Sequence, residues 1–223
     1  MQKENKNDVG LAAALFARLG AQVPHDFSRE SEADEFIRHN PDRKKSLLKV
    51  AELCGDPVTP EQLYLTALAY SWLGKEYSAQ AAHYANDYLH TSGWDALPSD
   101  VKEEDGIVVN HAMRQRASVL VNLANAQETL GCEEKSLFNF MEAYRLEPYN
   151  AMNAIRAADL LCKLHGKEEA LDFLRRQKLN PYYEPAVYRD RFGETHRNDF
   201  FKQLLDAAIL KMGGKIKPRS VFP

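Results

Sequence analysis

The chain has 223 residues, of which 44% are hydrophobic and 27% are charged, an ordinary balance for a globular protein. Its formal net charge is −3, so the composition gives no sign of the basic surface that nucleic-acid binding usually requires. The three cysteines are odd in number and irregularly spaced, which implies no disulfide framework and favours reduced thiols in the cytoplasm.

The N-terminal segment is unfavourable for export or membrane insertion. Its longest apolar stretch, Val9–Ala17, is too short to span a bilayer. The acidic residues Glu4 and Asp8 precede that stretch, whereas a signal peptide carries positive charge there. We therefore expect a cytoplasmic protein that has neither a membrane nor a nucleic acid as its partner.

Helix signals dominate the first third of the chain. Asn40-Pro41 supplies a cap followed by a proline at the first helical position, and Gly55 follows the end of the same apolar pattern. The helices expected in this region are 8–19, 29–39, which follows Ser28, and 41–54.

The rest of the chain continues with helices that end at glycine or proline. Thr59-Pro60-Glu61-Gln62 matches a capping box and predicts a helix that runs to Trp72-Leu73, before Gly74. The segment Thr91–Asp105, which contains Gly93, Pro98, Ser99 and several acidic residues, is expected to be a connector. Strand signals are nearly absent, since no stretch alternates apolar and polar residues between hairpin turns. The further expected helices are 76–90, a long one from about Glu104 or Gly106 to Leu130, 133–146, 150–164, 167–178 and 197–212.

Two consecutive segments, Ala117–Asn150 and Ala151–Glu184, repeat one pattern with a period of about 34 residues. Each contains a helix, a glycine turn, a second helix and a proline. Small residues recur where the two helices of a hairpin would cross, and large ones recur where neighbouring hairpins would meet. The small residues are Ala124, Ala143, Ala158 and Ala170, and the large ones are Leu120, Phe140 and Leu174. This pattern resembles that of the tetratricopeptide repeat (TPR) family.

The resemblance implies an all-α fold, a right-handed stack of antiparallel helical hairpins. Pro60–Gly93 is a weaker third copy, in which Ala79 takes a small slot and His83 takes a large one, so His83 is expected to be packed. The expected organisation is an N-terminal helical segment 1–56, repeats within 57–184 (60–93, 117–150 and 151–184, with a connector 94–105), and a C-terminal capping helix and basic tail in 185–223.

The sequence contains little that points to chemistry. Cys162 and His165 have the spacing of two metal ligands, but no second pair accompanies them, and a structural zinc site needs four ligands. There is no His-Glu-x-x-His motif, no nucleophile elbow and no glycine-rich phosphate loop. We therefore expect no enzyme activity, no catalytic residues, no metal and no cofactor.

In the TPR family the first helix of each hairpin lines a concave groove that holds a peptide. By that resemblance, the groove-facing residues are Glu61, Tyr64, Leu68 and Trp72; Ser118, Asn122, Asn125 and Glu128; and Met152, Ile155, Arg156 and Asp159. Of these, the residues expected to bind the partner are Tyr64, Leu68, Trp72, Asn122, Asn125, Arg156 and Asp159. Asn side chains can bond a peptide backbone through both donor and acceptor, and Arg156 could grip a carboxylate with two hydrogen bonds.

A packing interpretation of the same residues stays open. The stripe Tyr64, Leu68 and Trp72 also fits packing under the N-terminal helices, and the Asn and Arg side chains also fit internal hydrogen bonds.

The function expected from the resemblance is a non-catalytic scaffold or interaction module that binds an unidentified peptide or protein. One alternative is a structural protein that forms homo-oligomers through helix 197–212, with Phe200, Phe201, Leu204 and Ile209 exposed. Another is an enzyme or small-ligand receptor whose pocket lies between the N-terminal helices and the repeats. That pocket would contain several of His83, Glu128, Arg156 and Asp159.

Overall fold

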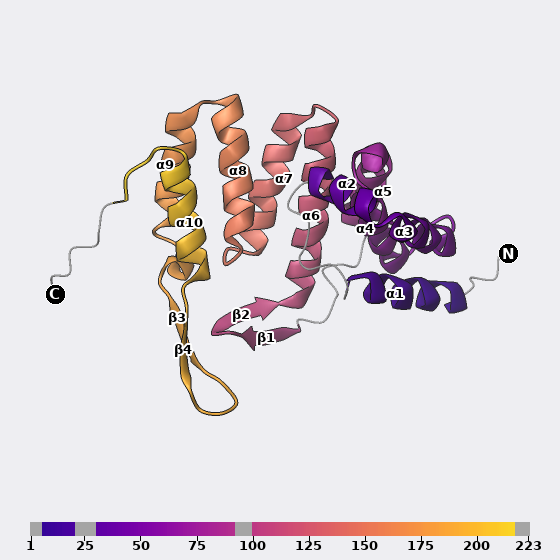
Figure 1. Ribbon diagram of the computed structural model, residues 1–223, viewed down its shortest axis with the longest axis horizontal. Coiled ribbons are helices and arrows are strands. Elements are labelled where there is room, and N and C mark those ends of the chain that lie inside the picture. The colour runs from indigo at the N-terminus through magenta and orange to yellow at the C-terminus, as the bar shows by residue number, and fades with distance from the viewer. Residues whose placement is uncertain (1–5, 21–29, 92–99, 217–223) are drawn as a thin grey trace. The chain divides into compact units, whose positions relative to one another are not determined.

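The computed structural model describes residues 6–20, 30–91 and 100–216 (Figure 1). This part of the chain is mostly helical, with ten α-helices and four short strands, so the all-α class is confirmed. Ser28 and residues 94–99 of the expected connector lie outside the described residues. The helices are α1 (Lys6–Gly20), α2 (Glu30–His39), α3 (Pro41–Cys54), α4 (Pro60–Trp72), α5 (Ser78–His90), α6 (His111–Thr129), α7 (Glu133–Leu146), α8 (Ala151–Leu164), α9 (Lys167–Gln177) and α10 (Phe200–Lys211). The strands are β1 (Val101–Glu104), β2 (Ile107–Asn110), β3 (Ala186–Arg189) and β4 (Thr195–Asn198).

The chain forms two compact units. The first unit comprises Met1–Pro98 and Ser118–Asn139, and the second comprises Ser99–Ala117 and Phe140–Pro223. The division into 1–56, 57–184 and 185–223 drawn from the sequence stays a prediction.

The core of the first unit joins the N-terminal helices to α4. Side chains of α1, α3 and α4 share one apolar cluster, which includes Ala12, Leu47, Val50, Leu65 and Ala69. Cys54 is buried in the same cluster, and this burial raises the pKa of its thiol. The N-terminal helices therefore pack directly on α4.

Helix α4 begins with the capping box expected from the sequence. The Thr59 hydroxyl accepts a hydrogen bond from the Gln62 N–H, and the Gln62 side chain accepts one from the Thr59 N–H. The helix ends before Gly74, which has a φ of +85°. A Cβ atom on Gly74 would overlap the carboxylate of Asp34, which accepts a hydrogen bond from the Lys75 N–H at 2.8 Å.

The expected position of His83 is wrong. A short 3-10 turn, Lys75–Tyr77, separates Gly74 from α5, and this turn shifts the buried face of the helix. The buried residues are Ser78, Ala81, Ala85 and Tyr88. Ala79 and His83 are both exposed, and His83 lies 3.6 Å from Asp87 on the outer side of the helix.

In the first unit, helix α6 packs on the α4–α5 hairpin and on α7. Its residues Val119 and Leu123 join Leu63, Ala67 and Tyr88 of the α4–α5 hairpin in a second apolar cluster. The backbone carbonyl of Ala124 accepts a hydrogen bond from the Ser136 hydroxyl of α7 at 2.7 Å. This contact holds the two helices of the α6–α7 hairpin close together.

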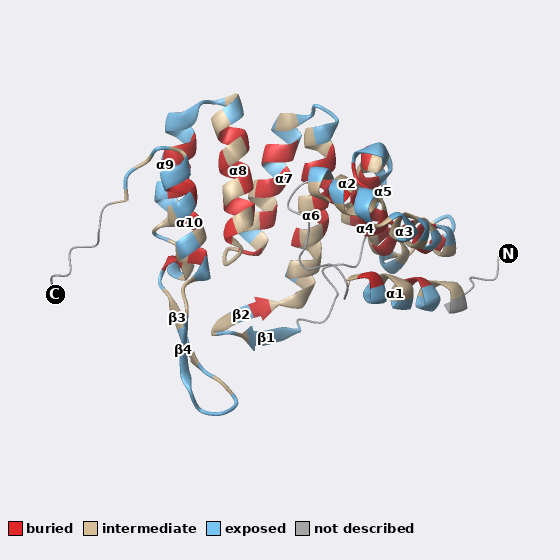
Figure 2. Cartoon of the chain, in the orientation of Figure 1, coloured by how far each residue is buried: buried red, intermediate tan, exposed pale blue. Residues whose placement is uncertain are grey.

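The second unit contains the α8–α9 hairpin, with α10 packed on both of its helices. The Asn150 side chain caps α8 by accepting a hydrogen bond from the Met152 N–H. Gly166, with a φ of +99°, makes the turn into α9. Buried small side chains, Ala158 and Ala170 among them, occupy the interior of this hairpin. Figure 2 shows buried residues alternating with half-buried ones on α8 and with exposed ones on α9.

Two short β-hairpins lie where the sequence predicts none. Strands β1 and β2 pair antiparallel around Asp105-Gly106, where both residues have positive φ, as a two-residue type I′ turn requires. Helix α6 consequently begins at His111, not at 104–106. Strands β3 and β4 pair around Arg191–Gly193, and Gly193 has a φ of +83°.

Candidate functional site

The stripe expected on α4 lies largely in the core of the first unit. Leu68 is 4% exposed. The Trp72 ring lies 4.7 Å from the Phe16 ring of α1, and the Tyr64 ring lies 5.8 Å from the Tyr88 ring, measured between centroids. These contacts favour the packing interpretation for Leu68 and Trp72, while Tyr64 is half-buried.

The two asparagines expected on α6 are also buried in the first unit. Asn122 is 9% exposed and Asn125 is 4% exposed. The Oδ1 atom of Asn122 accepts a hydrogen bond from the Ser71 hydroxyl at 3.0 Å. A buried amide that is already hydrogen-bonded stabilises the fold, so Asn122 ties α6 to the end of α4.

Arg156 and Asp159 lie together on α8 in the second unit. The guanidinium of Arg156 lies over the Phe140 ring at 5.0 Å, and its Nη1 atom lies 3.8 Å from the Asp159 carboxylate. Arg156 is only 4% exposed, whereas Asp159 is half-buried. Arg156 therefore reaches solvent poorly, and Asp159 is the accessible member of the pair.

One face of α8 keeps a row of partly exposed side chains. Met152, Ile155, Asp159 and Cys162 are all half-buried, and their spacing of three and four residues places them on one side of the helix. Met152 and Ile155 were among the groove-facing positions but outside the expected binding set. The row is mostly apolar and carries one carboxylate.

A polar network in the second unit was missed from the sequence. The Glu147 side chain is buried, and its Oε1 atom accepts hydrogen bonds from Arg114 Nε at 3.3 Å and from the Tyr149 hydroxyl at 3.1 Å. Its Oε2 atom accepts one from Asn150 Nδ2 at 3.4 Å, and Arg114 Nη1 also donates to Glu104 of β1 at 2.9 Å. No motif marks residues this far apart in the chain, so no pattern in the sequence could have found the network.

Burial raises the pKa values of two groups in this network, Glu147 and Tyr149. It raises the pKa of Glu147, although the hydrogen bonds and the charge of Arg114 act in the other direction. Burial and the neighbouring Glu147 charge raise the pKa of Tyr149 to about 12. The Glu147 carboxylate accepts hydrogen bonds on both oxygens, so the network connects β1, α6 and the α7–α8 turn.

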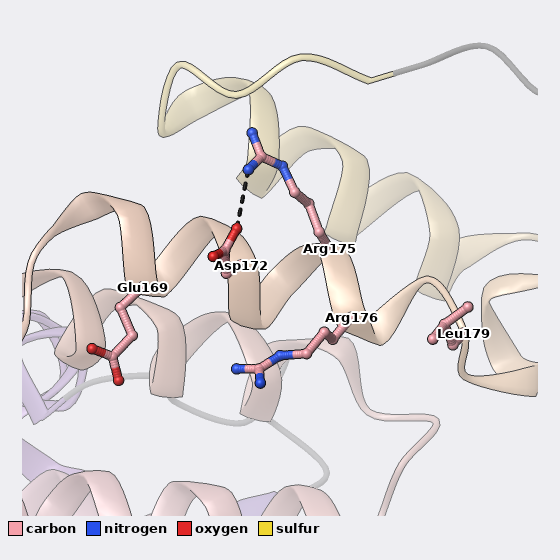
Figure 3. A pocket seen from close by; sticks show the side chains of 5 residues that line it. All are labelled: Glu169, Asp172, Arg175, Arg176 and Leu179. Atoms are coloured by element: carbon pink, nitrogen blue, oxygen red, sulfur yellow. Dashed lines mark hydrogen bonds and ion pairs between the residues drawn. The ribbon is translucent and has the colours of Figure 1, made fainter.

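A shallow pocket of about 780 Å³ lies along α9 (Figure 3). The described side chains that line it are Glu169, Asp172, Arg175, Arg176 and Leu179. Arg175 turns toward Asp172 and bonds it at 3.2 Å, while Arg176 extends along another side of the helix. Charged side chains that diverge around one exposed helix are typical of a solvated surface.

Within the described ranges, one group of side chains has the proximity of metal ligands. Ligand atoms of Asp190, Glu194 and His196 lie within 4.8 Å of one another at the β3–β4 turn. Asp190 accepts hydrogen bonds from the Phe192 and Glu194 N–H groups, and His196 lowers the pKa of Asp190 through a further hydrogen bond. These contacts account for the cluster as part of the turn.

The alternative of an enzyme or small-ligand receptor requires a polar pocket that contains several of His83, Glu128, Arg156 and Asp159. One of these four side chains does not fit such a pocket. His83 is exposed on the outer side of α5, so it cannot line a closed cavity.

In the part of the chain that the structure covers, no helix combines the length and apolar character that a bilayer crossing needs. No known protein-family model matches the chain, and comparison with curated proteins finds no similar sequence.

Proposed function

We propose that this protein is a non-catalytic interaction module, a TPR-like right-handed stack of helical hairpins that binds a peptide or a partner protein. The complete burial of Ala124, Ala143, Ala158 and Ala170 supports the proposal. Small side chains at these positions let the two helices of a hairpin approach closely. The free thiols of all three cysteines fit a reducing compartment such as the cytoplasm.

The half-buried row on α8 carries the proposal. Helix α8 packs against α9 and α10, and the row Met152, Ile155, Asp159 and Cys162 stays partly open to solvent. Met152 and Ile155 offer apolar contacts, and Asp159 offers a carboxylate to a basic group of the ligand. Binding therefore depends on Met152, Ile155 and Asp159, while Asn122, Asn125 and Arg156 act by holding the helices in place.

The test compares one substitution in the row with one outside it. Peptides are selected from a random display library on the immobilised wild-type protein, and the affinity of a labelled selected peptide is measured by fluorescence anisotropy. Ile155→Glu should weaken binding about tenfold or more, because it places a charge in the centre of the contact. Leu179→Glu, on a residue that is 88% exposed, should bind like the wild type.

Two outcomes oppose the proposal. One is a library that yields no enriched peptide. The other is an Ile155→Glu variant that keeps full affinity while circular dichroism shows an intact helical fold.

Exposed apolar side chains on α10 favour self-association as the second candidate function. Phe200 and Leu210 of α10 are 64% and 56% exposed. Phe201 and Ile209, which were expected to be exposed, are buried, and Leu204 is half-buried. Light scattering after size exclusion tests this candidate: a dimer that becomes a monomer in Phe200→Glu would support it, and a wild-type monomer would refute it.

A further inference from the structure

The β3–β4 hairpin extends away from helices α8, α9 and α10 of the second unit (Figure 1) and is exposed along most of its length (Figure 2). Its pairing places Val187 opposite Arg197 and Arg189 opposite Thr195. Side chains alternate between the two faces of a strand, so these four residues share one face. All four are exposed, and Val187 is 66% exposed.

The opposite face of the hairpin is anchored within the second unit. A Cβ atom on Gly106 of the β1–β2 turn would lie 3.1 Å from Ala186 and 3.3 Å from Tyr188. Asn198 Nδ2 donates a hydrogen bond to the Asp105 carbonyl at 3.3 Å. The face with Val187 and the two arginines therefore points outward.

The outward face carries positive charge that its own surroundings do not neutralise. Among the described residues, neither Arg189 nor Arg197 lies within ion-pair distance of a carboxylate. Asp190, the acidic residue next in sequence to Arg189, is held by His196 and by backbone N–H groups of the turn. Arg189 and Arg197 are diagonal cross-strand neighbours, close enough for long side chains of like charge to repel each other.

We propose that this face binds an acidic, extended peptide segment of a partner protein. Alternate residues of an extended strand lie about 7 Å apart, and diagonal neighbours in an antiparallel pair lie about 7–8 Å apart. Two carboxylates at alternate positions of such a peptide therefore match the two guanidinium groups, each of which can bind a carboxylate with two hydrogen bonds.

The remaining features of the hairpin fit a peptide better than a nucleic acid. Among the described residues the sheet has only two strands, so each strand has an edge on which a peptide backbone can pair. Val187 and Phe192, which is 75% exposed at the turn, add apolar contact area.

The experiment measures fluorescence anisotropy with three probes at low and at high salt. The first is a labelled peptide in which Glu alternates with Thr, the second is a single-stranded oligonucleotide of equal charge, and the third is a vesicle that contains phosphatidylserine. The peptide should bind at low salt, and Arg189→Gln/Arg197→Gln should weaken it about tenfold. Arg175→Gln/Arg176→Gln on α9, which removes the same charge, should leave the affinity unchanged.

Three results would overturn this assignment: no binding of the peptide, equal losses in both double variants, or binding of only the oligonucleotide or the vesicle. The hairpin surface is separate from the row on α8. Ile155→Glu should therefore leave the Glu–Thr peptide bound, and this variant distinguishes a failure here from a failure of the proposed function. Circular dichroism verifies that each variant keeps its helices.

Discussion

The α4–α5 hairpin of the first unit and the α8–α9 hairpin of the second both turn at a glycine with positive φ, but the turns are built differently. Gly166 has open space around its Cα atom, and α9 begins at the next residue. Gly74 lies against Asp34 and is followed by a 3-10 turn before α5 begins at Ser78. The first hairpin therefore follows the repeat register only in its first helix, whereas α8–α9 follows it in both.

The repeat pattern does not predict the buried face of α5. A helix presents one face to the core, and in α5 that face contains Ala81 and Ala85 instead of Ala79 and His83. Position 83 is a core position by the pattern and a surface position in the molecule. Substitutions at matched positions of the two hairpins should therefore differ in their effects on stability.

The largest difference between the two hairpins is expected for substitutions at the same repeat position, measured by the free energy of unfolding. Leu174 is fully buried in α9, so Leu174→Ala should lower the free energy of unfolding by about 2–5 kcal/mol. His83→Ala, in the corresponding slot of α5, should change it by less than about 0.5 kcal/mol. Urea titration followed by circular dichroism measures both. Similar losses in the two variants would contradict the shifted register.

The two turn glycines should also differ. Gly166→Ala should cost about 1 kcal/mol for the left-handed backbone alone. Gly74→Ala should cost about 2 kcal/mol or more, because its Cβ must also displace the Asp34 carboxylate. The same titration on Gly74→Ala, Asp34→Ala and the double variant should give a favourable coupling energy. Strict additivity would mean that Asp34 does not restrict the turn.

The first helices of the two hairpins start with different caps. Thr59→Ala removes the neutral capping box of α4 and should cost about 1 kcal/mol, independently of pH between 4 and 7, roughly as for other caps. Asn150→Ala removes the α8 cap together with its hydrogen bond to Glu147, so its cost should vary with pH. Denaturation at several pH values compares the two variants, and two parallel profiles would argue against a role for Glu147 at the α8 start.

The titration of Glu147 should have the smallest effect on the free energy of unfolding. Burial raises its pKa in the folded protein above the ordinary value of 4.5, so the folded state binds a proton more tightly than the unfolded state. The contribution of this residue to stability is therefore fully present below pH 4.5 and is lost as the pH rises through the raised value. Relative to Glu147→Gln, the wild type should gain stability on acidification. A gain in stability of the wild type over Glu147→Gln as the pH rises would contradict a raised pKa of Glu147 in the folded protein.

The sequence carries most of the helical organisation and little of the site. Apolar spacing, the Thr59 capping box and the turn glycines placed the helices, because these signals are local. The Asp105-Gly106 turn is a recognisable hairpin signal, but the acidic residues before it favour a connector over a strand. The β3–β4 hairpin has a weaker signal, since Thr195–Asn198 contains a single β-branched residue.

The binding residues were harder to predict, because exposure depends on contacts between distant segments. A resemblance gives the side of a helix on which a residue lies, but not whether a neighbouring helix covers it. Leu68, Asn122 and Arg156 stand at groove positions of the pattern and are nevertheless covered. Met152 and Ile155, on the same side of α8 as Asp159, keep partial exposure.

The three thiols of this chain differ widely in accessibility, so their rates of chemical labelling report on local opening of the structure. Cys132 is exposed, Cys162 is half-buried, and Cys54 is buried with a raised pKa. Thiolate is the reactive species, so a maleimide dye should label Cys132 first. Cys54 should react only when the apolar cluster around it opens, and the rate of its modification is then a clock for local unfolding of the N-terminal helices.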